Sequence, residues 1–167
     1  MAARVTDVMT LTSRLNTLPF DDLEGRADLE GRADLLAAVF GERLDSSVQL
    51  YPPFYSDHGL NTRFGRNVFV HQNCTFMDFG GITIGDDVMI SANVTLITSS
   101  HPVDPDRRRR AVTVAPIVLG DRAWVGAAST VLPGVTIGRD AVVGAGTVVS
   151  RDVPDGAVVT GHSAVVH

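Results

Sequence analysis

Residues 119–150 read LGDRAWVGAASTVLPGVTIGRDAVVGAGTVVS, and an aliphatic residue stands at every sixth position of this stretch. These positions are Leu119, Val125, Val131, Ile137, Val143 and Val149. Most are followed by a small residue, the exception being Val131, which is followed by Leu132. The same spacing runs earlier through 64, 70 and 76, and again through 84, 90 and 96, with two extra residues near Gly80 and Gly81.

A period of six fits neither the α-helical period nor the alternation of a strand. It fits a triangular coil with six residues on each side, in which every sixth side chain points inward and stacks on its equivalent one coil away. Only a small residue fits where the chain turns a corner. The spacing predicts an all-β solenoid with coils at about residues 64–81, 84–101, 119–136 and 137–154, and a buried ladder of Val, Ile and Leu. The alternative, a Val/Gly-rich β-sandwich, is disfavoured by six consecutive matches.

Composition limits the class of protein. The chain has 167 residues, 44% hydrophobic and 20% charged, which is typical of a globular domain. No stretch is apolar over the length of a membrane span, and the N-terminus does not resemble a signal peptide, so a cytoplasmic location is expected. Cys74 is the only cysteine, which excludes an intrachain disulfide. The net charge of −5 argues against general nucleic-acid binding.

Residues 1–47 lack the six-residue spacing, so we expect a helical N-terminal segment there, followed by a β-helix domain at 48–167. Apolar residues at mixed three- and four-residue spacing predict short helices at 6–18 and 28–40, the second ending at Gly41. The sequence DLEGRA occurs at 22–27 and again at 28–33. Six extra helical residues would rotate the rest of a helix by roughly 240°. We therefore interpret the repeat as a tolerated tandem duplication.

The six-residue spacing stops after Leu96 and resumes at Leu119, which predicts an extruded loop at about 98–116. His101 opens this loop, and four arginines occupy 107–110. A histidine exchanges protons near neutral pH and can remove the proton of an alcohol. Loop histidines are more often only solvated, and the arginine run favours a solvated loop over a phosphate contact. Pattern alone leaves both alternatives open.

Several motifs together resemble one enzyme family. They are PPFYSD (52–57), IGDDV (84–88), HPVDP (101–105), WVG (124–126), VLPGVTIG (131–138) and VGAG (143–146). In this order they are similar to the maltose/galactoside O-acetyltransferase branch of the hexapeptide-repeat acyltransferase superfamily, over about residues 50–161. The resemblance implies a left-handed parallel β-helix. It also implies transfer of an acetyl group from acetyl-CoA, as co-substrate, to a hydroxyl of a sugar or similar small acceptor, without a metal.

The resemblance also implies roles for individual residues. His101 matches the general base. Asp57, His71, Asn73 and Asp78 match positions that line the acceptor pocket. Trp124, Ala127, Ala145, Ser150 and Arg151 match positions near CoA. Family members are homotrimers with active sites between subunits. Simpler interpretations compete: Asp78 and Asp57 as turn residues, Trp124 as a packing residue, and Cys74 as a small corner residue and not a nucleophile.

The chain departs from the family in two places. His71 replaces the usual Asn, which predicts an altered acceptor subsite. The C-terminal end, residues 161–167, lacks the usual proline and arginine, which predicts weaker CoA binding. Three other functions stay open: a xenobiotic or serine O-acetyltransferase, a catalytically degenerate trimeric scaffold, and a zinc carbonic anhydrase. The last needs three converging histidines, and no third one lies near His71 and His101.

Overall fold

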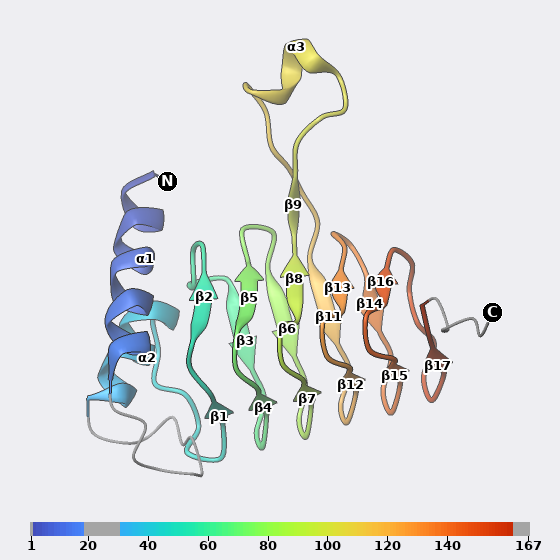
Figure 1. The fold of residues 1–167 in the computed structure, drawn as a ribbon, viewed down its shortest axis with the longest axis horizontal. Helices are drawn as coiled ribbons and strands as arrows, with labels where there is room; N and C mark the ends of the chain where they lie inside the picture. Colours follow the sequence, from blue (N-terminus) through green and yellow to red (C-terminus); the bar gives the residue numbers. More distant parts are fainter. Residues whose placement is uncertain (1, 19–30, 162–167) are drawn as a thin grey trace, which may run out of the picture.

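The computed structural model describes residues 2–18 and 31–161, and shows a parallel β-helix with two helices at one end and an arm projecting from its middle (Figure 1). The helices are α1 (Ala2–Thr17) and α2 (Arg32–Phe40). The predicted solenoid and its helical N-terminal segment are confirmed. The first DLEGRA copy and the start of the second, residues 22–30, and the tail beyond Gly161 lie outside the described residues.

Three parallel sheets form the sides of the coil. Sheet A contains β1 (Gln49–Leu50), β4 (Phe69–Val70), β7 (Met89–Ile90), β12 (Trp124–Val125), β15 (Val142–Val143) and β17 (Val158–Val159). Sheet B contains β2 (Phe54–Ser56), β5 (Cys74–Met77), β8 (Thr95–Ile97), β13 (Thr130–Val131) and β16 (Val148–Val149). Sheet C contains β3 (Thr62–Phe64), β6 (Ile82–Ile84), β11 (Ile117–Leu119) and β14 (Thr136–Ile137).

The six-residue spacing matches the packing of the core. All six aliphatic residues of the 119–149 series are buried, with exposed fractions of 4% or less. Val125 on β12 pairs in register with Ile90 on one side and Val143 on the other, so inward side chains stack from coil to coil. The small residues are required because the next coil is close. A Cβ on Gly126 would stand 2.5 Å from the carbonyl oxygen of Val143.

The corners between all three pairs of sheets include residues in the left-handed backbone region. Between sheets C and A these residues include Asn67, Asp87 and Asp140, with φ values of 54°, 60° and 59°. Asn and Asp tolerate this region better than most side chains. Each corner is also tied to its neighbour, since the N–H of Asp140 donates to the carbonyl of Asp121, which belongs to the preceding coil, over 3.0 Å.

The two helices close the first coil. Phe40 of α2 packs edge-on against Phe64 at 5.0 Å between ring centroids and lies 5.9 Å from Phe54. The side chain of Asn16 on α1 accepts the N–H of Phe54 at 2.8 Å and donates to its carbonyl at 3.0 Å. It therefore takes the place of a neighbouring strand at this end of sheet B. Gly41 ends α2 as expected, with a φ of 77°. None of the helices in the described part of the chain combines the length and apolar character that a membrane crossing requires.

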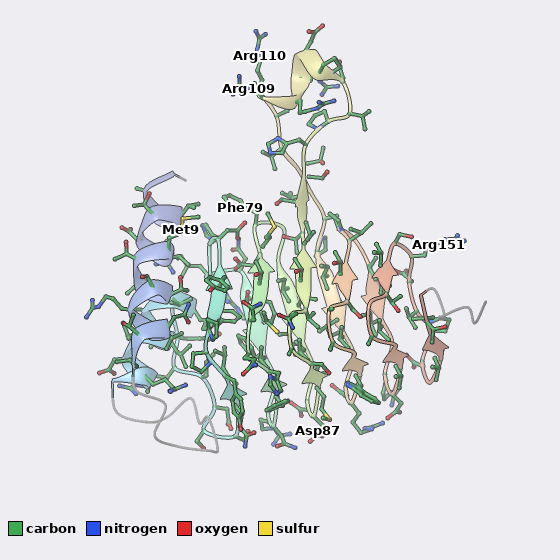
Figure 2. All side chains as sticks on the ribbon, in the orientation of Figure 1. Met9, Phe79, Asp87, Arg109, Arg110 and Arg151 are labelled. Atoms are coloured by element: carbon green, nitrogen blue, oxygen red, sulfur yellow. The ribbon has the colours of Figure 1, made fainter. Side chains whose placement is uncertain are left out.

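The arm interrupts the coil without disturbing it. It comprises β9 (Ser99–Ser100), which pairs antiparallel with β10 (Thr113–Val114), and the short helix α3 (Pro105–Arg108) at its tip (Figures 1 and 2). The strands on either side pair as if no insertion were present, because Met89 lies opposite Trp124 and Ile82 opposite Ile117. The predicted loop is therefore an ordered projection from the edge between sheets B and C.

Ile137→Ala should destabilise the fold by about 2–5 kcal/mol, because the fully buried side chain would leave a cavity in the stack. Val148→Ala, at a position that is 64% exposed, is the control and should change the free energy of unfolding by less than about 0.5 kcal/mol. Urea denaturation measures both. Equal effects would contradict the inward stacking of the six-residue series.

Candidate functional site

The edge at which sheet A passes into sheet B, the A–B corner, gathers four of the residues expected to bind ligands. It is formed by residues 71–73, 91–93, 126–128 and 144–146 in successive coils. His71, Asn73, Ala127 and Ala145 therefore lie along one line of the solenoid. Backbone hydrogen bonds connect the turns, such as that from the N–H of Gly146 to the carbonyl of Ala127 at 2.8 Å.

In the later coils, at residues 126–128 and 144–146, the A–B corner carries only small side chains. Ala127 is half-buried and Ala145 is exposed, and a Cβ built on Gly146 would meet no heavy atom within 4 Å. Ala128 and Gly146 occupy the left-handed region, with φ values of 57° and 69°. The side chains present are methyl groups or hydrogens, so a linear molecule can lie directly against the backbone here.

The other end of the same corner is polar and aromatic. The ring of His71 lies 5.6 Å from both Tyr51 and Phe69, and its Nδ1 accepts the N–H of Gln72 at 2.8 Å. That bond leaves the ring Nε2 to carry the proton. The amide of Asn73 donates to the Asn93 side chain at 2.6 Å.

Trp124 stands on the outer face of sheet A, half-exposed, and its indole N–H donates to the hydroxyl of Ser91 at 3.0 Å. It belongs to an outward row in which successive strands face one another in register. The row consists of Phe69, Met89, Trp124, Val142 and Val158. Three of its members are among the large apolar side chains that the chain exposes, so this face carries a continuous apolar ridge.

Asp57 and Asp78 lie on the opposite edge of sheet B, where it passes into sheet C. The Asp78 side chain is fully buried, and its carboxylate accepts four hydrogen bonds. The donors are the hydroxyl of Ser56 (3.2 Å) and the N–H groups of His58 (3.1 Å), Gly59 (2.8 Å) and Asn61 (3.0 Å). Asp78 thus fixes the turn that follows β2, whereas the simpler interpretation assigned that turn to Asp57; contact with an acceptor stays a prediction.

Asp57 is the less buried partner of this pair. Its Oδ1 accepts the N–H of Asp78 at 2.9 Å. Burial, then a hydrogen bond with the Asp78 carboxylate and its negative charge, raises the pKa of Asp57 to about 7. Burial acts to raise the pKa of Asp78 too, but the backbone donors Gly59, His58 and Asn61 and the Asp57 side chain outweigh it and hold that pKa below its usual range. Below about pH 7, Asp57 therefore carries a proton beside an ionised Asp78.

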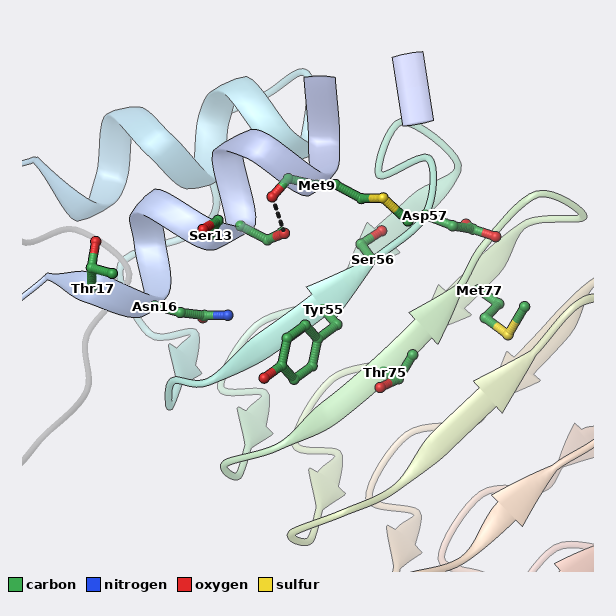
Figure 3. Close-up of a pocket in the computed structure, with 10 residues that line it drawn as sticks. Met9, Ser13, Asn16, Thr17, Tyr55, Ser56, Asp57, Thr75 and Met77 are labelled. Atoms are coloured by element: carbon green, nitrogen blue, oxygen red, sulfur yellow. Dashed lines mark hydrogen bonds between the residues drawn. The ribbon is translucent and has the colours of Figure 1, made fainter. Parts of the chain in front are cut away.

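Asp57 also borders a groove of about 630 Å³ between α1 and the outer face of sheet B (Figure 3). Met9, Tyr55 and Met77 supply its apolar surface, while Thr12, Ser13, Asn16 and Thr17 add polar groups from the helix. Tyr55 points outward into this groove because it lies between two buried residues of β2. The position of α1 could not be inferred from the sequence.

His101 is exposed on the arm, one residue after β9. Its Nδ1 lies 3.1 Å from the carbonyl oxygen of Ala111, on the returning strand of the arm. A carbonyl only accepts, so Nδ1 carries the proton and the lone pair of Nε2 stays free. The arm therefore holds the neutral imidazole in the tautomer with its proton on Nδ1 and its lone pair on Nε2.

Ser150 and Arg151 follow β16 at the same edge of sheet B as Asp57, but in a coil near the C-terminal end, and both are exposed (Figure 2). Residues 107–110 of the arginine run are exposed as well, and Arg108 donates to the carbonyl of Val103 at 2.7 Å, which closes the tip of the arm. Burial raises the pKa of the Cys74 thiol to about 11, so this cysteine is not an activated nucleophile. Among the described residues, no group of three or more His, Cys, Asp or Glu side chains is placed to hold a metal ion.

One chain therefore does not bring all the predicted residues together. His71, Asn73, Trp124, Ala127 and Ala145 lie at or beside the A–B corner. Asp57, Asp78, His101, Ser150 and Arg151 lie on the far edge of sheet B or on the arm that leaves it. The resemblance implies active sites between subunits, and within a single chain the width of sheet B separates the two groups.

Asp57→Asn should flatten the dependence of stability on pH. Protonated Asp57 stabilises the native state fully below the ordinary Asp pKa of 3.8, and this contribution is lost as the pH rises through about 7. The amide keeps an acceptor for the Asp78 N–H and a donor toward its carboxylate, and it does not titrate. We expect the wild-type melting temperature to fall between about pH 4 and 7, and that of the variant to fall less. Parallel curves would contradict the proton on Asp57.

Comparison with known proteins agrees with this architecture. The family model described as "Bacterial transferase hexapeptide (six repeats)" matches residues 116–151, and "Hexapeptide repeat of succinyl-transferase" matches residues 62–97. The galactoside O-acetyltransferase of Lactococcus lactis is 38% identical over 134 residues, which cover 79% of this chain. The match covers 64% of that enzyme, so the chain spans less than two thirds of the relative's length.

Two solved structures have the same fold. A maltose O-acetyltransferase from Clostridium difficile 630 superposes with a TM-score of 0.85 at 31% identity, over 96% of this chain and 82% of its own. A galactoside acetyltransferase in complex with coenzyme A gives a TM-score of 0.83 at 31% identity, over 96% and 77%. The β-helix is therefore left-handed, as expected, and the chain belongs to the hexapeptide-repeat acetyltransferases, in the branch of the maltose and galactoside O-acetyltransferases.

Proposed function

We propose that the chain transfers an acetyl group from acetyl-CoA to a hydroxyl of a sugar or a similar small acceptor, with His101 as the general base. The observation that carries this proposal is the bond between Nδ1 of His101 and the Ala111 carbonyl, which leaves Nε2 free on an exposed arm. The named relatives, a maltose and two galactoside acetyltransferases, support the reaction class.

The chemistry follows from that tautomer. Nε2 of His101 takes the proton of the acceptor hydroxyl while the hydroxyl oxygen forms a bond to the thioester carbon. The negative charge that develops on the carbonyl oxygen needs a hydrogen-bond donor, for which backbone N–H groups beside the site are candidates. Collapse of the tetrahedral intermediate breaks the C–S bond, and the proton on His101 passes to the CoA sulfur. The products are the acetyl ester and CoA.

The A–B corner has the shape that the CoA arm requires. Ala127 and Ala145 present backbone with little side chain, and the space beside Gly146 is open. Ser150 and Arg151, on the far edge of sheet B, would contact the nucleotide end, where a cation favours phosphate. The relative solved with coenzyme A has the same fold over 96% of this chain, which supports the binding of CoA.

The separation of the residues favours a site shared between subunits. If the edge that carries Asp57 and the His101 arm faces the A–B corner of a second copy, both groups meet in one cleft. Such a head-to-tail contact closes into a ring when the rotation permits, and a homotrimer is the ring expected for this branch. The apolar ridge of Phe69, Met89, Trp124, Val142 and Val158 supplies surface that such a contact would cover.

The acceptor is proposed to bind beside Asp57. A carboxyl group with a pKa of about 7 can accept or donate a hydrogen bond to a hydroxyl near neutral pH. His71, in place of the usual Asn, would present an Nε2–H to the acceptor, because its Nδ1 already accepts the N–H of Gln72. Asn73 belongs to the same strip as His71, and Asp78 holds the turn that follows Asp57.

His101→Ala should lower kcat for acetyl transfer by about 100-fold or more, since the general base is lost. The assay is acceptor-dependent release of CoA thiol with glucosides, galactosides, maltose, chloramphenicol-like alcohols and serine. Val103→Ala on the same arm, 89% exposed, is the control and should keep its activity. Undiminished transfer by His101→Ala would refute the role of His101. Absence of transfer by the wild type at saturating acetyl-CoA would instead favour a degenerate scaffold.

Two inactive variants should complement each other if the site is shared. His101→Ala removes the base, while Ala145→Trp fills the A–B corner on an exposed position and blocks CoA. In each mixed trimer one of the three interfaces would combine an intact arm with an intact corner, so activity should return to about a third of the wild-type value. Co-expression with two different affinity tags isolates the mixed species. No recovery in mixed trimers would contradict a site between subunits.

A further inference from the structure

We propose that Thr98 and Gly80 are positioning residues that set the direction of the arm and thereby place His101. This inference rests on the proposed function, since it concerns the base of that reaction. The arm comprises residues 99–114, and its neck is the pair of residues, Thr98 and Ala115, from which the two strands leave the coil. Neither Thr98 nor Gly80 belongs to the residues so far placed in the site.

The Thr98 hydroxyl anchors the outgoing strand. Thr98 is fully buried, and its Oγ1 donates to the carbonyl of Met77 at 2.6 Å. The same Oγ1 accepts the N–H of Gly80 at 2.7 Å. The backbone N–H of Thr98 also donates to the Met77 carbonyl, at 3.0 Å. One threonine therefore connects the start of the arm to two points of the preceding coil.

Gly80 provides the surface on which the neck rests. A Cβ at this position would stand 2.8 Å from the carbonyl oxygen of Thr98, and 2.9 and 3.0 Å from the N and O atoms of Ala115. Both strands of the arm thus contact the same glycine through their backbones. The N–H of Ala115 donates to the Thr98 carbonyl at 2.9 Å, which closes the neck.

The coil beneath the neck is held by Asp78. Gly81 donates its N–H to the carbonyl of Asp78 at 2.9 Å, and the buried carboxylate of Asp78 binds the turn after β2. The arm is therefore connected to the same turn that carries Asp57. Beyond the neck, two residue pairs join the strands, Ser99 with Val114 and Ser100 with Thr113, and residues 103–110 are exposed.

A small tilt at the neck is enlarged farther along the arm. His101 lies three residues beyond Thr98, and misplacing a catalytic group by about 1 Å can cost about 100-fold in rate. A displaced neck should therefore lower kcat while the KM for acetyl-CoA changes little, because the A–B corner that receives CoA is on the other edge of sheet B. Loss of global stability would not produce this pattern.

The test compares Gly80→Ala, Thr98→Val and Thr98→Ser with the wild-type chain. Gly80→Ala forces a Cβ against the neck, and Thr98→Val removes the hydroxyl at constant shape. We expect both to lower kcat by about tenfold or more with the KM for acetyl-CoA within about twofold. Thr98→Ser keeps the hydroxyl and should restore most of kcat. Ile137→Ala, destabilised in the distant core, is the control and should keep kcat at a temperature where it is folded.

A second readout does not depend on activity. Arg107, Arg108, Arg109 and Arg110 offer trypsin sites on the exposed arm, so the rate of cleavage there reports how firmly the arm is held. Cleavage should be faster in Gly80→Ala and Thr98→Val, and unchanged in Thr98→Ser and Ile137→Ala. Wild-type kcat and cleavage rates in Gly80→Ala and Thr98→Val would overturn the proposal. So would an equal fall of kcat in Ile137→Ala. An inactive wild-type chain would refute the proposed function, while the cleavage rates would still decide the role of the neck.

Discussion

The structure depends on the closeness of successive coils. The N–H of a turn donates to a carbonyl of the coil before it, as Gly146 does to Ala127 at 2.8 Å, and inward side chains such as Val125 fill the triangle between the sheets. A Cβ on Gly126 would stand 2.5 Å from the Val143 carbonyl oxygen, so this position has no room for a side chain. This constraint produces the six-residue period of the sequence, because each side of the coil needs one inward aliphatic residue and one small residue. Everything that could bind a ligand lies outside this stack, on the corners, the arm or the groove.

The solenoid could be predicted from residues 119–149 because its contacts repeat at a constant sequence distance. The same reasoning located the arm, since the spacing fails between Leu96 and Leu119. The site was predictable only as a list of residues. The proton on Asp57 depends on the turn at 58–61 folding over Asp78, and the groove depends on where α1 packs. Neither of these two contacts recurs at a constant sequence distance, so the six-residue spacing could not predict them. The importance of Thr98 was also hidden, because a threonine at the end of a strand carries no signal of what its hydroxyl binds.

The expected site residues are divided between two edges of sheet B, so a single chain carries two separate halves of the candidate site. A continuous line of turns forms one half, with Ala127 and Ala145 exposing backbone. The other half consists of a buried carboxylate, its protonated partner and an imidazole on an arm. The later coils of the first half offer only backbone and small side chains, while His71 and Asn73 stand in an earlier coil of the same corner. The second half lies outside the regular repeat, and the general base proposed for the reaction belongs to it.

The arm leaves and re-enters the solenoid while Met89 still pairs with Trp124 and Ile82 with Ile117. An insertion at this corner therefore costs the core nothing, and the entropy of closing a longer loop grows only slowly with its length. The arm can therefore change in length or sequence during evolution while the buried residues of the coils stay the same. The same separation makes this corner a natural place to graft a foreign peptide, which the coils would display at a fixed height above their surface.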